Sequence, residues 1–242
     1  MSSKGRDLRE QRVLVVGRGS GIARAVVLAA RDAGATVVVA GRDQAKLATA
    51  YDEEPDITTE VVDLTDEASI EALARRLGTV DHVVSTASAR ARGRLADLDR
   101  EALRLSFDTK VIGPLMLAKH FAPRMAEHGS IVIFSGVAAA KIAVGTLGVA
   151  ITNGAAEVLA RSLALELAPI RVNAISPGII DTGAWDAFGD QGKADYFADI
   201  SSRNPAGRIG STDDIADAVL FALTNTFLTG VTLHVDGGEP LT

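Results

Sequence analysis

Glycines near the start of the chain are spaced in a way that suits the binding of a phosphate group. Small residues alternate along the segment Gly17-Arg18-Gly19-Ser20-Gly21-Ile22-Ala23. They let the backbone turn tightly and approach a ligand closely. An apolar run precedes the segment and a helical pattern follows it, so the N–H groups at the start of a helix would face the ligand. An ordinary tight turn needs one or two glycines, and the cluster therefore predicts binding of a dinucleotide pyrophosphate.

A second feature follows the next apolar run, Thr36–Ala40. A site for NAD(H) places Asp or Glu after this run to bind the ribose 2′-hydroxyl, but here Gly41-Arg42 follows. The Arg42 guanidinium would suit a 2′-phosphate, with help from Arg18 in the glycine-rich segment. The alternative is a solvated arginine at the start of a loop. We expect NADP(H) rather than NAD(H).

The elements that must position these residues alternate along the chain. Short apolar runs alternate with longer helical patterns, which is typical of β-α units and of a parallel sheet covered on both faces. The expected strands are Val13–Val16, Thr36–Ala40, Thr58–Val62, Val80–Val84, Ser130–Phe134, Arg171–Ile175 and Val231–Val235. The longest expected helices cover roughly Arg100–Glu127 and Gly148–Leu167. The pattern predicts an α/β fold, a single-domain doubly wound parallel sheet (an NAD(P)-binding Rossmann fold) over residues 1–242, with ligands beyond the carboxyl ends of the strands.

Composition narrows the possible partners. The formal net charge of −6 argues against nucleic acid or an anionic membrane surface as a partner. The chain has no cysteine and its four histidines lack ligand-like spacing, so we expect no metal site and no thiol chemistry. The polar start, residues 1–11, is predicted to be a tail without the apolar region of a signal peptide. No apolar run is long enough to span a bilayer, and we expect a cytoplasmic protein.

From residue 13 to residue 238 the sequence resembles the short-chain dehydrogenases/reductases. The glycine-rich segment is similar to that family's T-G-x-x-x-G-I-G loop, with Val16 in place of the Thr and Ala23 in place of the last Gly. The other matching segments are Asp63-Leu64, Ser162–Ala168, Ile170–Asn173, Pro177–Thr182, Gly207–Gly210, Asp214–Ala216, Thr229-Gly230 and Val235–Gly238.

The resemblance implies roles for these segments. It implies that Asp63 and Leu64 hold the adenine, and that Ile180 and Thr182 contact the nicotinamide amide. The expected cofactor-binding residues are Gly17, Arg18, Gly19, Ser20, Gly21, Ile22, Arg42, Asp63, Leu64, Ala87, Ile180 and Thr182. Residues 183–208 would form a substrate lid. The C-terminal helix and last strand build oligomer faces in this family, which implies a homodimer or homotetramer.

The positions of the family's Asn-Ser-Tyr-Lys tetrad carry other residues. Counting back from Ser162 puts Val149 at the Tyr position and Asn153 at the Lys position. Gly136 falls at the Ser position, and Lys110 falls at the Asn position. All four positions are changed on this alignment. The nearby candidates offer no acid of Tyr-like pKa one helical turn from a lysine; they are Ser135, Lys141, Thr146 and Thr152.

Lys and Asn have thus exchanged places. We hypothesise that Lys110 is a cation on the cofactor side and the acid of an altered reaction, with Asn153 as its catalytic partner. The alternative is independent drift in a site without remaining chemistry. The stretch Arg90–Arg94 could attract an anionic substrate tail or could be a solvated loop.

Three functions follow from this pattern. The nominal assignment is an NADP(H)-dependent oxidoreductase with a non-standard active site, acting on a small carbonyl or alcohol substrate. The preserved cofactor segments favour it, since hydride transfer is the chemistry of the cofactor. One alternative is a non-redox cyclase, isomerase or lyase on the same scaffold. The other is a catalytically inactive cofactor-binding or regulatory subunit.

Overall fold

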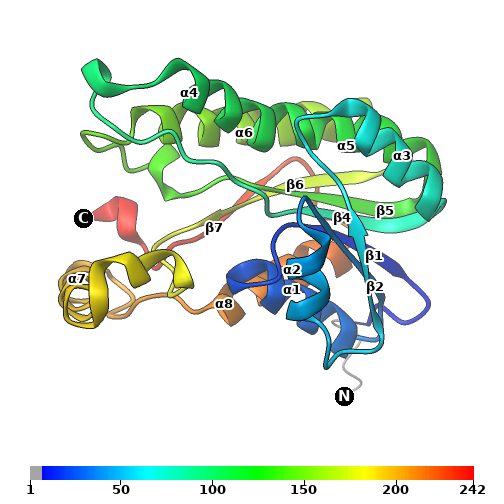
Figure 1. The fold of residues 1–242 in the computed structure, drawn as a ribbon, viewed down its shortest axis with the longest axis horizontal. Helices are drawn as coiled ribbons and strands as arrows, with labels where there is room; N and C mark the ends of the chain where they lie inside the picture. The colour runs from blue at the N-terminus through cyan, green and yellow to red at the C-terminus, as the bar shows by residue number, and fades with distance from the viewer. Residues whose placement is uncertain (1–6) are drawn as a thin grey trace.

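The computed structural model describes residues 7–242, and they form one parallel sheet covered by helices on both faces (Figure 1). The strand order is β3-β2-β1-β4-β5-β6-β7. The strands are β1 (Arg12–Val16), β2 (Thr36–Gly41), β3 (Ile57–Val61), β4 (Val80–Ser85), β5 (Met125–Phe134), β6 (Arg171–Pro177) and β7 (Thr232–Val235). The predicted doubly wound Rossmann fold is confirmed.

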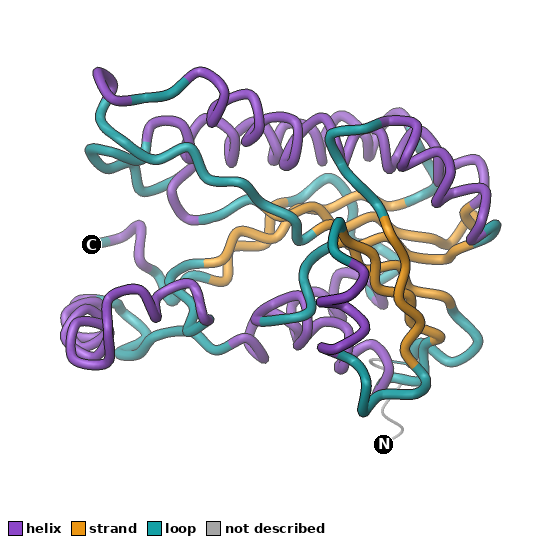
Figure 2. Tube along the Cα trace, in the orientation of Figure 1, coloured by secondary structure: helices purple, strands orange, loops and turns teal. Residues whose placement is uncertain are grey.

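Two layers of helices enclose the sheet (Figures 1 and 2). On one face lie α1 (Gly21–Asp32), α2 (Gln44–Ala50) and α8 (Thr212–Thr224). On the other lie α3 (Glu67–Leu77), α4 (Arg100–Phe107), α5 (Gly113–Phe121) and α6 (Leu147–Glu166). The remaining long helix, α7 (Gly189–Arg203), stands apart near the C-terminus.

Strand β1 explains why the apolar runs are continuous rather than alternating. Val13 and Val15 pack in the core on the side of α1 and α8, whereas Leu14 and Val16 pack in the core on the side of α3 and α5. Side chains of successive strand residues point to opposite faces, so a strand covered on both faces must be apolar throughout.

The chain reverses its winding direction at β1, which pairs with β2 on one side and β4 on the other. At the carboxyl end of β1, Val16 lies opposite Ala40 of β2 and Ser85 of β4. The glycine-rich segment therefore begins at the topological switch point, where open α/β sheets bind ligands.

The long helix predicted over Arg100–Glu127 is wrong in its continuity and in its end. Residues Asp108–Ile112 form a π-helical segment between α4 and α5, and β5 begins at Met125. Pro123 provides the reason for the early end, because it has no N–H for a helical hydrogen bond. The π-helical segment carries Lys110, and such segments often occur at functional sites.

The N-terminal segment also differs from the prediction. Residues 1–6 of the predicted polar tail lie outside the described residues. Residues 7–11 belong to the fold, since Leu8 is fully buried and its N–H donates to the Ala33 carbonyl over 2.9 Å. Between residues 7 and 242, no helix combines the length and hydropathy that crossing a membrane requires.

Candidate functional site

The glycines of the segment after β1 are required by close packing against the chain itself. A Cβ on Gly17 would lie 2.1 Å from Thr86 Oγ1, and one on Gly19 would lie 2.4 Å from the Ala50 Cβ. Gly21 adopts a φ of +56°, in the left-handed region. The segment therefore lies close to the ends of β2 and β4, and its glycines have no side chains that would cover the backbone.

Helix α1 begins without a side-chain cap. Ser20 stands at the N-cap position, but its side chain accepts no hydrogen bond, and the first turn contains no acidic residue. Asp43 and Asp66, by contrast, cap α2 and α3. The first N–H groups of α1 therefore have no side-chain acceptor and suit a phosphate. Together with the glycine backbone, this arrangement fits a dinucleotide pyrophosphate.

The other predicted cofactor residues lie around this segment. Thr182 is adjacent to it, since a Cβ on Gly21 would lie 3.4 Å from the Thr182 Cβ. Asp63 organises the turn after β3, where its Oδ1 accepts from the Thr65 N–H over 2.9 Å. Leu64 and Ile180 are buried, whereas Arg18 and Arg42 are exposed and make no ion pair among the described residues.

Lys110 and Asn153 meet at the carboxyl end of β5. Lys110 Nζ donates to the Ser135 carbonyl over 2.9 Å, and Asn153 Nδ2 donates to the neighbouring Gly136 carbonyl over 3.0 Å. Lys110 is only 7% exposed. Burial, and to a lesser extent the positive charge of Arg90, lowers the pKa of Lys110 to about 7. An amine with this pKa can give up or take a proton near neutral pH.

Gly136 and Asn153 pack against each other. Gly136 has an extended backbone, and a Cβ there would lie 3.0 Å from Asn153 Nδ2. Oδ1 of Asn153 is buried and has no hydrogen-bond partner among residues 7–242. Val149 lies one helical turn before Asn153 on α6 and is half-buried.

The hydroxyl and amine groups nearest to these residues take part in structural hydrogen bonds. Ser135 Oγ donates to Glu157 Oε1 over 2.7 Å. Lys141 Nζ donates to the Glu239 carbonyl. Thr146 and Thr152 donate to carbonyls of their own loop and helix. Glu157 was missed by the sequence analysis, although it lies one turn after Asn153 and so faces the same side of α6.

The arginine-rich loop after β4 is attached to two neighbouring segments. Ser106 Oγ donates to the Ala89 carbonyl over 2.8 Å, and the Gly93 N–H donates to the Gly145 carbonyl over 3.0 Å. Arg90 lies between these two bonds. Its pKa is lowered by burial and then by the charges of Arg92 and Arg18. The loop is therefore held in place against α4 and the segment before α6.

The segment predicted as a lid forms a short 3₁₀ helix, Gly183–Phe188, followed by α7. Trp185 is buried, and its Nε1 donates to the Ile180 carbonyl over 2.8 Å. Its ring contacts Phe188, Tyr196 and Phe197 at centroid distances of 6.0, 5.0 and 6.4 Å. This aromatic cluster connects the segment to the end of β6.

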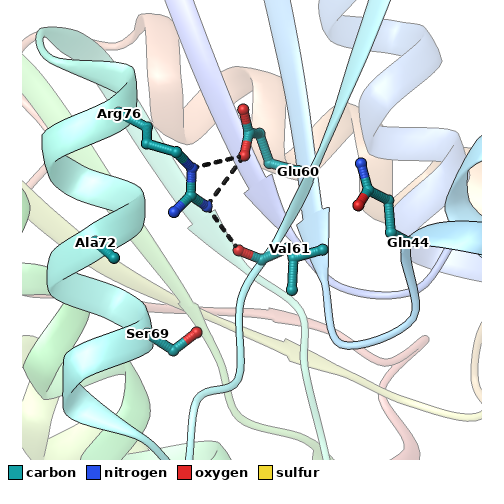
Figure 3. A pocket seen from close by; sticks show the side chains of 6 residues that line it. All are labelled: Gln44, Glu60, Val61, Ser69, Ala72 and Arg76. Carbon is teal, nitrogen blue, oxygen red and sulfur yellow. Dashed lines mark hydrogen bonds and ion pairs between the residues drawn. The ribbon is translucent and has the colours of Figure 1, made fainter.

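A separate surface hollow lies beside the edge strand β3 (Figure 3). Arg76 crosses it and pairs with Glu60 over 3.1 Å, and it also donates to the Val61 carbonyl. These bonds pair the Arg76 and Glu60 side chains with each other and give the Val61 carbonyl, at the free edge of β3, a donor. The hollow is therefore a feature of the sheet edge, and we assign it no ligand. In the part of the chain that the structure describes, no cluster of His, Asp or Glu is arranged to hold a metal ion.

Comparison with known proteins identifies the family. Residues 16–239 match the family model described as "Enoyl-(Acyl carrier protein) reductase". The match covers most of the chain, including the glycine-rich segment and the end of β7. The protein belongs to the short-chain dehydrogenase/reductase family, whose members are oxidoreductases.

Individual relatives agree with this assignment. The chain is 34% identical to L-xylulose reductase of Mesocricetus auratus, covering 96% of this chain and 97% of that one. A small-chain dehydrogenase solved in complex with NADPH is 31% identical, with a TM-score of 0.82 over 96% of this chain and 99% of that one. Gluconate 5-dehydrogenase of Burkholderia cenocepacia J2315, solved with NADP and tartrate, is 26% identical, with a TM-score of 0.90 over the whole of both chains.

Proposed function

We propose that this protein is an NADP(H)-dependent oxidoreductase that interconverts a small carbonyl compound and its alcohol at a non-standard active site. The observation that carries the proposal is the position of Lys110. It is a buried amine with a pKa near neutrality, and it stands at the carboxyl end of β5, on the same edge of the sheet as the segment that fits a pyrophosphate. The NADPH and NADP complexes of structural relatives support the choice of cofactor.

Different residues of this chain would bind different parts of the cofactor. The N–H groups of Gly19, Gly21 and Ile22 would bind the pyrophosphate, as the uncapped start of α1 indicates. Arg42 and Arg18 pair with the 2′-phosphate, since neither has an acidic partner of its own among the described residues. Adenine lies by Asp63, Leu64 and Ala87, and the nicotinamide amide lies by Ile180 and Thr182. The bound cofactor supplies or accepts the hydride.

Lys110 would then handle the proton. In reduction, its ammonium donates a proton to the carbonyl oxygen as the carbon receives the hydride, and the product is an alcohol. In oxidation, the neutral amine takes that proton back. The Asn153 side chain positions the end of β5 by donating to the Gly136 carbonyl. Val149 and Gly136 carry no group that can transfer a proton, and the proposal assigns them no chemical step.

Three further features complete the proposal. Residues 183–208 act as a lid over the substrate, supported by the aromatic cluster around Trp185. The protein assembles as a homodimer or homotetramer, supported by apolar side chains exposed on α6 and α8, such as Ile151, Val158 and Phe221. We propose a cytoplasmic location, supported by the acidic net charge.

The test is loss of the NADPH absorbance in the presence of a panel of small aldehydes, ketones and keto sugars. Wild-type protein should consume NADPH, and Lys110→Met should lose most of this activity while still binding NADPH. Lys119→Met, which removes an exposed lysine paired with Glu67, is the matched control and should retain activity. Substrate conversion without net cofactor consumption would favour a non-redox enzyme instead. Binding of NADPH without any turnover would favour a regulatory subunit.

A further inference from the structure

Several arginines of the described chain pair with carboxylates, as Arg76, Arg203 and Arg208 do. Arg90 and Arg92, on the loop after β4, have no acidic partner among the described residues. Their charges instead act on each other, and the Arg90 charge acts on Lys110. Cations that face one another without an acid between them are suited to an anionic ligand.

The backbone that carries Arg90 is fixed on both sides. Ala89 accepts the hydrogen bond from Ser106 Oγ, and Gly93 donates to the Gly145 carbonyl. Ala91 is buried against α6, where a Cβ on Gly148 would lie 2.6 Å from its carbonyl oxygen. A backbone held this way presents the exposed Arg90 side chain from a defined point, which lowers the entropy cost of binding an anion.

The buried groups at the carboxyl end of β5 have hydrogen-bonding capacity left over. A lysine ammonium has three donor hydrogens, and the Ser135 carbonyl is the acceptor found for Lys110 among the described residues. Asn153 Oδ1 is buried without a partner, although Asn153 is only 2% exposed. Unmatched buried polar groups cost free energy, and a bound polar molecule would reduce that cost.

We propose that Arg90 binds the carboxylate of the substrate while Lys110 contacts its carbonyl oxygen, so that the substrates are oxo acids and the matching hydroxy acids. The proposal rests on the reductase function given above and names its substrate class. Arg90 forms charge-assisted hydrogen bonds to the carboxylate, bidentate where the geometry allows. Reduction then adds a hydride to the oxo carbon and a proton from Lys110 to its oxygen, giving a hydroxy acid.

An anion near Arg90 could also come from the cofactor, because Arg18 of the glycine-rich segment is close enough to affect the pKa of Arg90. The experiment separates the two sources. Oxamate, an unreactive mimic of a 2-oxo acid, is titrated into the NADP⁺-saturated protein by calorimetry. Its uncharged isostere oxamide and NADPH are titrated in parallel. The proteins are wild type, Arg90→Ala, Arg90→Lys and the control Arg161→Ala, which removes an exposed arginine of α6.

We expect oxamate to bind the wild-type protein more tightly than oxamide does. Arg90→Ala should weaken oxamate binding about tenfold or more, with NADPH affinity and melting temperature unchanged. Arg90→Lys should retain part of the affinity, and Arg161→Ala all of it. Weaker NADPH binding with unchanged oxamate binding in Arg90→Ala would assign Arg90 to the cofactor and overturn the proposal. Failure of oxamate to bind the wild-type protein would also overturn it.

The outcome is distinguishable from failure of the proposed function. If neutral carbonyl compounds are reduced but oxamate does not bind, the reductase function is supported and the oxo-acid subsite is refuted. If oxamate binds through Arg90 but no carbonyl compound is reduced, the anion subsite is supported and the reductase function is refuted.

Discussion

Replacement of Lys110 by methionine should stabilise the protein without cofactor. The pKa of Lys110 falls from 10.5 to about 7, mainly through burial. Each pKa unit corresponds to about 1.4 kcal/mol, so holding the charged form in the folded state costs at most about 5 kcal/mol. The lost hydrogen bond to the Ser135 carbonyl offsets roughly 1 kcal/mol of this. Lys110→Met should therefore raise the free energy of unfolding by about 2–4 kcal/mol at neutral pH.

The gain should depend on pH in a defined direction. Between pH 7 and 10.5 the unfolded chain binds a proton at Lys110 that the folded chain releases, so the stability of the wild-type protein rises with pH over this window. The advantage of Lys110→Met should be largest at or below about pH 7 and should shrink toward about pH 10. Urea unfolding of both proteins across this range measures it, with Lys119→Met as the control. A destabilised Lys110→Met, or a gain that is the same at every pH, would refute the reasoning.

Three other perturbations have expected outcomes. Burial lowers the pKa of His82 to about 4, so the stability that its neutral form supports is lost as pH falls below 6.5. Urea unfolding should show about 2 kcal/mol less stability from this group at pH 5 than at neutral pH. The variant His82→Gln should lose that dependence on pH. Gly17→Ala should lower the free energy of unfolding by about 1–3 kcal/mol, because the new Cβ would collide with Thr86. Gly154→Ala places its Cβ in open space on α6 and should raise the free energy of unfolding by about 0.5–1 kcal/mol. Thermal unfolding that ranked the two variants the other way would contradict the packing. Trp185→Phe keeps an aromatic ring but removes the hydrogen bond to Ile180, and should raise the KM for the carbonyl substrate more than it lowers kcat if residues 183–208 form the lid.

The sheet was predictable because the pattern that identifies each strand lies within a few consecutive residues. A strand buried on both faces favours a continuous apolar run, and the buried residues Val13–Val16 of β1 and Val37–Ala40 of β2 form such runs. The glycine-rich segment was predictable for a similar reason, since close approach of backbones excludes a Cβ at Gly17 and Gly19. Both patterns can be read from a short stretch of sequence.

The details that depend on distant residues could not be read in this way. Leu8 looks like part of a polar tail until α1 and β2 supply the core that buries it. The early start of β5 could not be read because Met125, Ala126 and Glu127 suit a helix equally well, although Pro123 gave a signal. The family resemblance predicts that Lys110 and Asn153 have exchanged places, but the pKa of Lys110 depends on burial that only the assembled fold provides.

The most direct test of the account is a calorimetric titration of the purified protein with NADPH, NADP⁺, NADH and NAD⁺, repeated with Arg42→Ala. The account predicts NADPH binding at about micromolar affinity or tighter, weaker NADH binding, and a loss of about tenfold or more in NADPH affinity on Arg42→Ala with little change for NADH. Absence of binding by all four nucleotides would contradict it, because the glycine-rich segment would then serve only the packing of β1 against its neighbours.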